Sequence, residues 1–286
     1  MAYQIVRAEW LGPKLKLLEV AAPEVAQAAA PGQFIMLRLH ERGERIPLTI
    51  ADFDPGRGTV TIIFLVVGKT TEELATLERG GAILDFVGPL GNHLELEAPG
   101  TVVVIGGGVG VPAVYPKAKA LKAAGNYLIS IIGARSEELL VLEQQMRAIS
   151  DEFYVTTDDG SQGRRGFVSD ELAELLASGR QIDQVIAVGP IPMMAAVAKV
   201  TAPAGVRTLV SLNPIMVDGT GMCGGCRVRV AGKNRYACVD GPIFDAHQVD
   251  FGELMSRQGR FVPQEQDSLD RHHACRLGGS ANAAPA

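Results

Sequence analysis

The sequence has little of what marks a membrane protein, a secreted protein or a nucleic-acid-binding protein. Its longest apolar runs, at 62–67 and 102–105, are far too short to cross a bilayer. The first ten residues alternate apolar and polar side chains and lack the plan of a signal peptide. The 286 residues include 27 basic and 32 acidic ones, a formal charge of −5, so no dense basic face follows a phosphate backbone. We therefore expect a cytoplasmic protein without a membrane span or a nucleic acid partner.

Cysteine is also scarce, and its placement is informative. Four cysteines in a chain of this length do not make a disulfide scaffold. Three of them, Cys223, Cys226 and Cys238, lie within sixteen glycine-rich residues, whereas Cys275 stands alone near the end. Such clustering favours a metal centre over disulfide bonds.

Length and composition indicate a globular protein of two domains with room for a small third module, since 47% of the residues are apolar and 21% are charged. Residues 1–98 form the first domain. Short alternating or β-branched runs between turn signals predict a barrel or sandwich, with one short helix starting near Thr70. The expected strands cover 3–10, 14–20, 34–39, 59–66 and 82–87.

Residues 99–212 have a different pattern, in which apolar strands alternate with helices. That order predicts a doubly wound parallel sheet. The expected strands cover 101–105, 127–132, 153–157, 184–188 and 206–210, and the expected helices cover 111–124, 137–149, 169–177 and 193–200.

Residues 213–251 are too rich in glycine and cysteine to build a core of their own, so a metal centre is expected to hold this module together. One hairpin is expected in it, over 227–230 and 235–239. Residues 252–286 begin with a possible helix, and the tail from Gly278 is expected to be disordered.

Three segments are candidate anion or nucleotide sites. The glycines at 106–110 follow a strand and open a helix, which lets the backbone approach a pyrophosphate; the alternative is a tight packing turn. The run from Arg45 to Ile50 suits a diphosphate with a flat polar ring, unless Arg45 simply pairs with Glu44 or Asp52. The segment 67–71 is either an anion site or an ordinary helix cap. Arg135, after the next strand, leaves room for a 2′-phosphate.

The strongest pattern is Asp218-x4-Cys223-x2-Cys226-x11-Cys238. Plant-type [2Fe–2S] proteins space their first three cysteines in this way, and here Asp218 occupies the first position. Zinc is the alternative, because three thiolates and a carboxylate suit it too. Asp218 is either the fourth ligand or a turn residue, and in the second case Cys275 becomes a candidate ligand.

Together these pieces resemble the ferredoxin–NADP reductase superfamily. The resemblance rests on Arg45-x-Pro47-Leu48-Thr49, Gly88-Pro89-Leu90-Gly91, the glycine-rich turn, and Gly189-Pro190-x-Pro192-Met193-Met194. The cysteine module narrows it to the group that contains the electron-transfer subunit of dihydroorotate dehydrogenase. Within that group the chain is most similar to the small-subunit family of NADH-dependent reduced ferredoxin:NADP⁺ oxidoreductases, because the dihydroorotate branch has cysteine where this chain has Asp218.

The resemblance implies an FAD-binding antiparallel barrel, a doubly wound nucleotide-binding domain and a small C-terminal [2Fe–2S] module. It implies FAD contacts from Arg45, Pro47, Leu48, Thr49, Phe64, Leu65, Val66, Lys69, Thr70 and Thr71. It implies NAD(H) or NADP(H) contacts from Gly106, Gly107, Gly108, Gly110, Arg135, Gly189, Pro190 and Met193, and metal ligation by Asp218, Cys223, Cys226 and Cys238.

The implied function is oxidation of NAD(P)H at FAD and transfer of single electrons through the cluster to a larger flavin and iron–sulfur subunit, with ferredoxin reached through that partner. The implied setting is an electron-bifurcating transhydrogenase. The same module serving dihydroorotate dehydrogenase, a hydrogenase or a sulfide-oxidising complex is the alternative. A non-enzymatic iron–sulfur or zinc sensor is a third hypothesis. No side chain is expected to act as a catalytic acid or base, since the cofactors carry the chemistry.

Overall fold

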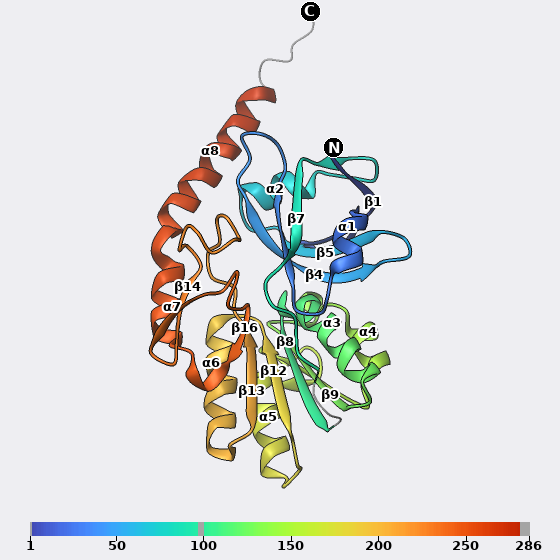
Figure 1. The fold of residues 1–286 in the computed structure, drawn as a ribbon, viewed down its shortest axis with the longest axis vertical. Helices are drawn as coiled ribbons and strands as arrows, with labels where there is room; N and C mark the ends of the chain where they lie inside the picture. The colour runs from blue at the N-terminus through green and yellow to red at the C-terminus, as the bar shows by residue number, and fades with distance from the viewer. Residues whose placement is uncertain (1, 97–99, 281–286) are drawn as a thin grey trace, which may run out of the picture.

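The computed structural model describes residues 2–96 and 100–280, with side chains described as far as Ala274. Figure 1 shows a β-barrel at one end, an α/β domain at the other, and the C-terminal segment along one side of both. This arrangement confirms the predicted fold class.

The N-terminal part is an antiparallel sheet in the strand order β6-β1-β2-β5-β4-β3-β7, curved into a nearly closed barrel. Along β5, Val60, Ile62 and Phe64 fill the barrel core, whereas Ile63 and Leu65 on the opposite face pack against the core of the α/β domain. Because successive side chains of a strand point to opposite faces, β5 contributes to the cores of both domains. The strands are β1 (Tyr3–Gly12), β2 (Leu15–Ala21), β3 (Phe34–Arg38), β4 (Ile46–Asp54), β5 (Thr59–Leu65), β6 (Ala82–Ile83) and β7 (Asp85–Leu90), and the helices are α1 (Pro23–Ala28) and α2 (Lys69–Ala75).

The α/β domain has the strand order β11-β10-β9-β8-β12-β13-β16, parallel except for β16. Its central strand β8 is buried on both faces: Val102 and Val104 pack with α3, and Val103 and Ile105 pack with α5 and α6. The parallel strands are β8 (Thr101–Gly107), β9 (Tyr127–Ala134), β10 (Glu152–Thr157), β11 (Arg164–Arg165), β12 (Gln184–Val188) and β13 (Arg207–Ser211). The helices are α3 (Gly110–Ala123), α4 (Glu143–Ile149), α5 (Val168–Ala177) and α6 (Ile191–Thr201), with short 3₁₀ turns η1 (Glu137–Leu139) and η2 (Ala202–Ala204).

The C-terminal segment is attached to the α/β domain more firmly than the sequence suggested. Strand β16 pairs with β13, and Val228 and Phe244 belong to the same apolar cluster as Val210. The module thus shares a core with its neighbour and does not depend on a metal alone. Its elements are β14 (Arg227–Val230), β15 (Lys233–Tyr236), β16 (Ile243–Asp245), η3 (Ala246–Gln248), α7 (Phe251–Gln258), η4 (Gly259–Phe261) and α8 (Val262–Ser280).

Two local expectations are wrong. The single helix expected over 137–149 is a 3₁₀ turn followed by α4, because Val141 turns into the core between them and Leu142 adopts a left-handed φ of 53°. The tail expected to be disordered from Gly278 is helical through Ser280. The rest of that expectation, 281–286, lies outside the described residues.

Candidate functional site

A cavity of about 430 Å³ lies where the barrel, the α/β domain and the C-terminal module meet. Nine of the predicted cofactor residues line it: Pro47, Leu48, Thr49, Phe64, Leu65, Thr71, Gly110, Gly189 and Pro190. Sequence reasoning missed other lining residues, namely Phe34 from β3 and Asn213, Pro214, Met216 and Pro242 from the module. A largely apolar slot between two domains suits a flat, mostly aromatic cofactor.

The remaining predicted barrel residues do not line this cavity. Arg45 is exposed at the start of β4. Its suggested pairing partners are engaged elsewhere, since Asp52 binds Lys119 Nζ at 2.9 Å and Glu44 accepts a hydrogen bond from Thr70 at 2.6 Å. The pairing of Arg45 with Glu44 or Asp52, the simpler alternative, is therefore not among the contacts of the described residues.

The segment that begins α2 contains a built cap. The Thr71 hydroxyl accepts the N–H groups of Val67 and Gly68, each at 3.0 Å. Helix capping, the simpler alternative for 67–71, is thus realised at Thr71. Val66 and Lys69 lie on either side of this turn and, like Thr70, do not line the cavity.

The glycine-rich turn combines packing with ligand access. A Cβ at Gly110 would lie 2.0 Å from the Val188 carbonyl oxygen, and one at Gly107 would lie 2.4 Å from Met193 Sδ, so Gly110 lets α3 approach the end of β12 and Gly107 lets the start of α6 approach β8. Gly106 is likewise closed in by Val111. Gly108, with φ of +52°, has no atom within 4 Å of where its Cβ would be, although its own N–H donates to the Gly133 carbonyl at 2.8 Å, so the open space lies beside the turn at the start of α3.

Two acidic residues that sequence reasoning did not single out stand beside Arg135. The Asp158 and Asp159 N–H groups donate to the carbonyls of Ala134 and Arg135 at 3.1 and 3.2 Å, which joins the ends of β9 and β10. Hydrogen bonds from Ser161 hold the pKa of Asp159 below its usual value, so this exposed carboxylate is ionised at neutral pH. The Asp158-Asp159-Gly160 turn directly after a strand was the signal that could have identified them.

The cysteine loop brings two thiols together in a buried place. Cys226 Sγ and Cys238 Sγ lie 3.2 Å apart, and each residue is 2% exposed. Burial, followed by the contact with Cys226, raises the pKa of the Cys238 thiol to about 12. The Cys238 thiol therefore keeps its proton at neutral pH, and a metal that binds there would have to displace it.

The other two candidate ligands lie at the exposed end of the loop. Cys223 is exposed, and its sulfur accepts the Gly225 N–H at 3.4 Å. The Asp218 carboxylate accepts the N–H of Thr220 at 2.8 Å and of Cys223 at 2.7 Å, and these bonds, led by Thr220, lower its pKa. Three thiols on a glycine-rich loop are the donor set that iron–sulfur clusters use, so the residues fit that group. Among the described residues no three histidine, cysteine or acidic side chains are arranged to hold a metal ion, so the structure brings together Cys226 and Cys238 but not all four predicted ligands.

Cys275, the alternative fourth ligand, is carried by α8. That helix runs from the module toward α2, and His273 meets Glu72 of α2 at 3.0 Å (Figure 1). The backbone at 275 is therefore on the barrel side of the molecule, and its side chain lies outside the described part of the chain.

Among the described helices, none is both long and apolar enough to span a membrane.

The fold and this site define a class of protein, the reductase-type electron-transfer unit with a nucleotide domain and a cysteine module. Two family models match the chain: the oxidoreductase NAD-binding domain over residues 104–199, and the iron–sulfur cluster binding domain of dihydroorotate dehydrogenase B over residues 213–250. These matches confirm the prediction of an NAD(P)H-dependent oxidoreductase with an iron–sulfur module.

The chain belongs to the family of dihydroorotate dehydrogenase B electron transfer subunits and their homologs. It is 49% identical over 252 residues to the electron transfer subunit homolog of Thermotoga maritima, covering 88% of this chain and 89% of that one. The electron transfer subunit of Fusobacterium nucleatum is 34% identical over 235 residues, covering 79% and 89%.

A solved structure adds a second comparison. A chain from the NADH-dependent reduced ferredoxin–NADP oxidoreductase, studied for flavin-based electron bifurcation, superposes with a TM-score of 0.90 at 46% identity, covering 95% of this chain and 98% of that chain. A ferredoxin NADP⁺ reductase from Neisseria gonorrhoeae, at 15% identity and a TM-score of 0.61, covers 72% of this chain and 91% of its own, and shares the fold. The predicted family resemblance is confirmed.

Proposed function

We propose that this chain is an electron-transfer subunit that oxidises NADH at an FAD held in the cavity and passes electrons one at a time through a [2Fe–2S] cluster to a larger partner. The observation that carries the proposal is the cavity itself, because the barrel, the nucleotide turn and the cysteine module all contribute residues to its lining. FAD supplies the conversion from a two-electron donor to one-electron carriers when it is bound. The protein supplies binding, orientation and exclusion of water.

Each part of the chain has its own task in this function. Pro47, Leu48 and Thr49 offer an apolar wall and one hydroxyl for a flavin ring, with Phe64 and Leu65 beside them. The open space beside Gly108 and the start of α3 suit the pyrophosphate of the nucleotide. Gly189 and Pro190 on the same cavity bring the nicotinamide end to the flavin wall. Arg45, Val66, Lys69 and Thr70 are proposed for the outer, phosphate end of FAD.

The metal centre is proposed to be [2Fe–2S], ligated by Cys223, Cys226, Cys238 and Asp218. The x4 and x2 spacings and the glycines around them favour iron–sulfur over zinc, and the iron–sulfur family model covers the same residues. The domain limits that go with this assignment are 1–98, 99–212, 213–251 and 252–286.

The partner is proposed to be a larger flavin and iron–sulfur subunit in a bifurcating transhydrogenase, which the flavin-based electron bifurcation named for the structure of 46% identity favours. A dihydroorotate dehydrogenase is the alternative, which the names of the Thermotoga and Fusobacterium relatives favour. Affinity purification followed by mass spectrometry separates the two, because the co-purifying subunit differs.

The first prediction tests the function and its nucleotide together. Mixed without oxygen, NADH should bleach the flavin and then produce the reduced-cluster signal in electron paramagnetic resonance. NADPH should act at least about tenfold more slowly, because the ionised Asp159 and neighbouring Asp158 repel a 2′-phosphate near Arg135. Asp158→Asn with Asp159→Asn should narrow that ratio. Protein without flavin or iron would overturn the function, and faster bleaching by NADPH would overturn the nucleotide assignment.

The second prediction concerns Arg45. Arg45→Ala should weaken FAD binding by roughly 30-fold, or about 2 kcal/mol, because a charge-assisted contact to a phosphate is lost. The cysteine module should stay folded, since most of the apolar residues that it packs against belong to the α/β domain. Arg42→Ala is the matched control, an equally exposed arginine on the same loop. Flavin content and a fluorescence titration of the apoprotein measure the effect, and an unchanged affinity would remove Arg45 from the site.

A further inference from the structure

A group of arginines lies beside the cysteine loop. Arg227 directly follows Cys226 and begins β14, and Arg257 of α7 donates a hydrogen bond from Nη2 to the Gly225 carbonyl at 3.4 Å. Arg260 follows in the next turn, η4. A guanidinium group keeps its positive charge at any pH at which the protein is folded, so this group of arginines is a fixed source of positive charge.

The electrostatics of Arg257 show how close these groups lie to one another. Burial lowers the pKa of Arg257, and the positive charges of Arg227 and Arg260 lower it further. Glu253, one turn earlier on α7, and Cys226 act in the opposite direction, because negative charge near a guanidinium favours its protonated form. Arg257 therefore lies within electrostatic reach of both other arginines and of a proposed cluster ligand.

The carboxylate beside this group does not balance its charge. Among the described residues, the ion-pair partner of the three arginines is Glu253, whose Oε1 lies 4.0 Å from Arg227 Nη2. Arg227 Nε is buried and has no hydrogen-bond partner. Burying the donor of a charged group without an acceptor is unfavourable. An anionic group that binds at the neighbouring cysteines would supply the negative charge that these side chains call for.

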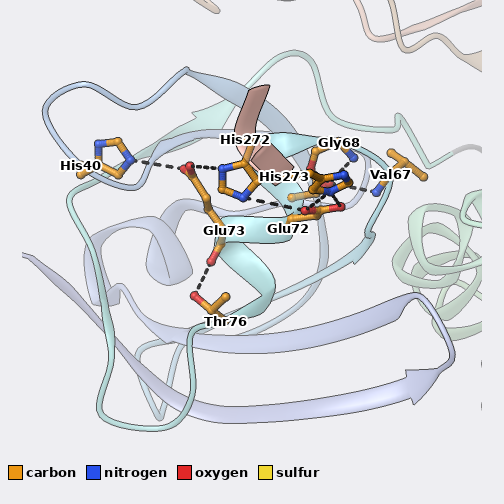
Figure 2. A network of polar contacts seen from close by, with 9 residues as sticks. His40, Val67, Gly68, Glu72, Glu73, Thr76, His272 and His273 are labelled. Atoms are coloured by element: carbon orange, nitrogen blue, oxygen red, sulfur yellow. Dashed lines mark hydrogen bonds and ion pairs between the residues drawn. The ribbon is translucent and has the colours of Figure 1, made fainter. Parts of the chain in front are cut away.

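The helices that carry Arg257 and Arg260 are held at both ends. Near the cysteine module, Gln258 donates to the Asn213 carbonyl at 3.1 Å. At the other end, α8 meets α2 through ion pairs and hydrogen bonds between imidazoles and carboxylates. The members of this network, which Figure 2 shows from close by, are His40, Glu72, Glu73, His272 and His273. Folded contacts on both sides therefore set the position of the two arginines relative to the cysteine loop.

We propose that Arg227, Arg257 and Arg260 are the counter-charge of the iron–sulfur centre and raise its reduction potential. The inference rests on the [2Fe–2S] centre of the proposed function. Thiolate and carboxylate ligands give such a centre a net negative charge, and each electron that it accepts from the flavin makes it more negative by one. Positive groups in a partly buried place favour the more negative form, because the low dielectric strengthens their attraction to it. The arginines thus favour transfer of single electrons to the centre.

A potentiometric titration of the holoprotein tests this role, with dithionite as the reductant and the electron paramagnetic resonance of the reduced cluster as the readout. Arg227→Gln and Arg257→Gln should each lower the ratio of reduced to oxidised centre at a fixed potential at least about tenfold, or about 59 mV for a one-electron couple. At position 257, glutamine keeps a donor for the Gly225 carbonyl and removes only the charge. Glu253→Gln should shift the ratio in the opposite direction, because it removes a carboxylate beside Arg227.

Two further variants separate charge from structure. Arg257→Lys keeps the charge and should stay within about threefold of the wild-type ratio. Arg229→Gln is the matched control, since it removes an exposed arginine from the same strand, and it too should stay within about threefold because water screens an exposed charge. Unchanged potentials in Arg227→Gln and Arg257→Gln would overturn the inference. An equal shift in Arg229→Gln would also overturn it, because only the net charge of the protein would then matter.

The same titration separates this inference from the proposed function. Because dithionite supplies the electrons, the predicted shifts would stand even if NADH failed to bleach the flavin, and only the proposed function would fall. A centre that NADH reduces, but whose potential responds to none of these substitutions, would leave the function in place and remove the role of the arginines. Zinc, or no metal at all, at the cysteines would overturn both.

Discussion

Lys117→Met is expected to stabilise the protein at neutral pH and to flatten the pH dependence of its unfolding. Lys117 lies on α3 with 0% of its surface exposed, and its ammonium donates to the carbonyl of Ala113 at 2.8 Å in its own helix. Removal from water lowers the pKa of Lys117 from 10.5 to about 7. Lys16 is equally buried, but its ammonium has a carboxylate partner, Glu78, at 2.6 Å, whereas the ammonium of Lys117 bonds only to a backbone carbonyl.

The direction of the pH dependence follows from the protonation of Lys117 in the folded and the unfolded states. The unfolded chain keeps the Lys117 proton up to pH 10.5, whereas the folded chain releases it near pH 7. Between these values the unfolded state binds more protons, so the free energy of unfolding rises with pH. The contribution is up to about 1.4 kcal/mol per pH unit, or about 4 kcal/mol between pH 7 and 10.

Urea denaturation followed by circular dichroism at pH 7, 8, 9 and 10 measures this difference. The wild type should gain stability relative to Lys117→Met as pH rises from 7 to 10 and the buried lysine loses its charge, so Lys117→Met should exceed the wild type most at pH 7. Lys119→Met, a half-exposed lysine on the same helix that binds Asp52, is the matched control. Parallel curves for the wild type and Lys117→Met would show that the buried amine does not titrate near neutrality.

The overall architecture could be predicted because short runs of the sequence indicate which type of strand each forms. Continuous apolar strands such as 101–105 and alternating ones such as 59–65 predict two different sheets, and the structure has both. The exceptions depend on distant contacts. Strand β16 pairs with β13, more than thirty residues earlier, and nothing in its three residues indicates an edge strand of the larger sheet.

The candidate site was predictable where one segment carries its chemistry. Pro47, Leu48, Thr49 and Gly110, which line the cavity, come from such segments, because each belongs to a short motif with a physical purpose. The module residues Met216 and Pro242, which close the cavity, were missed because their role appears only when three parts of the chain meet. The same reason hides the network of His40, Glu72 and His272, whose members are far apart in sequence.

The buried Lys117 was also hidden by its sequence context. It stands on α3 between Pro116 and Ala118, where charged and apolar residues alternate with no clear face. A lysine in such a helix is normally exposed. Only the packing of Gly32 and Ile243 close to this point shows that the side chain is enclosed, since a Cβ on Gly32 would lie 3.4 Å from Lys117 Cε.

Substitution of Asp218 should have the largest effect on the metal centre. Asp218→Ala removes the proposed fourth ligand together with the acceptor of the Thr220 and Cys223 N–H groups. One iron would then be open to water, so the cluster should lose iron to a chelator at least about tenfold faster than in the wild type. Iron and sulfide analysis with the spectrum of the reduced cluster measures this loss, and zinc in the metal analysis would favour the alternative ion.

Two further variants separate ligation from loop closure, because Asp218 is placed to do both. Asp218→Asn keeps an oxygen that accepts the Thr220 N–H but gives up the anionic ligand, whereas Asp218→Cys keeps an anionic ligand and gives up the oxygen acceptors. If Asp218 ligates iron, the cysteine variant should retain a [2Fe–2S] centre with a shifted potential, since a soft thiolate donates more charge to iron than a carboxylate, and the asparagine variant should be labile. Retention in Asp218→Asn and loss in Asp218→Cys would instead assign Asp218 to closing the loop. Because the carboxylate already bonds two backbone N–H groups, ligation would require it to exchange at least one of them for iron, and a potentiometric titration of the two variants decides whether it does.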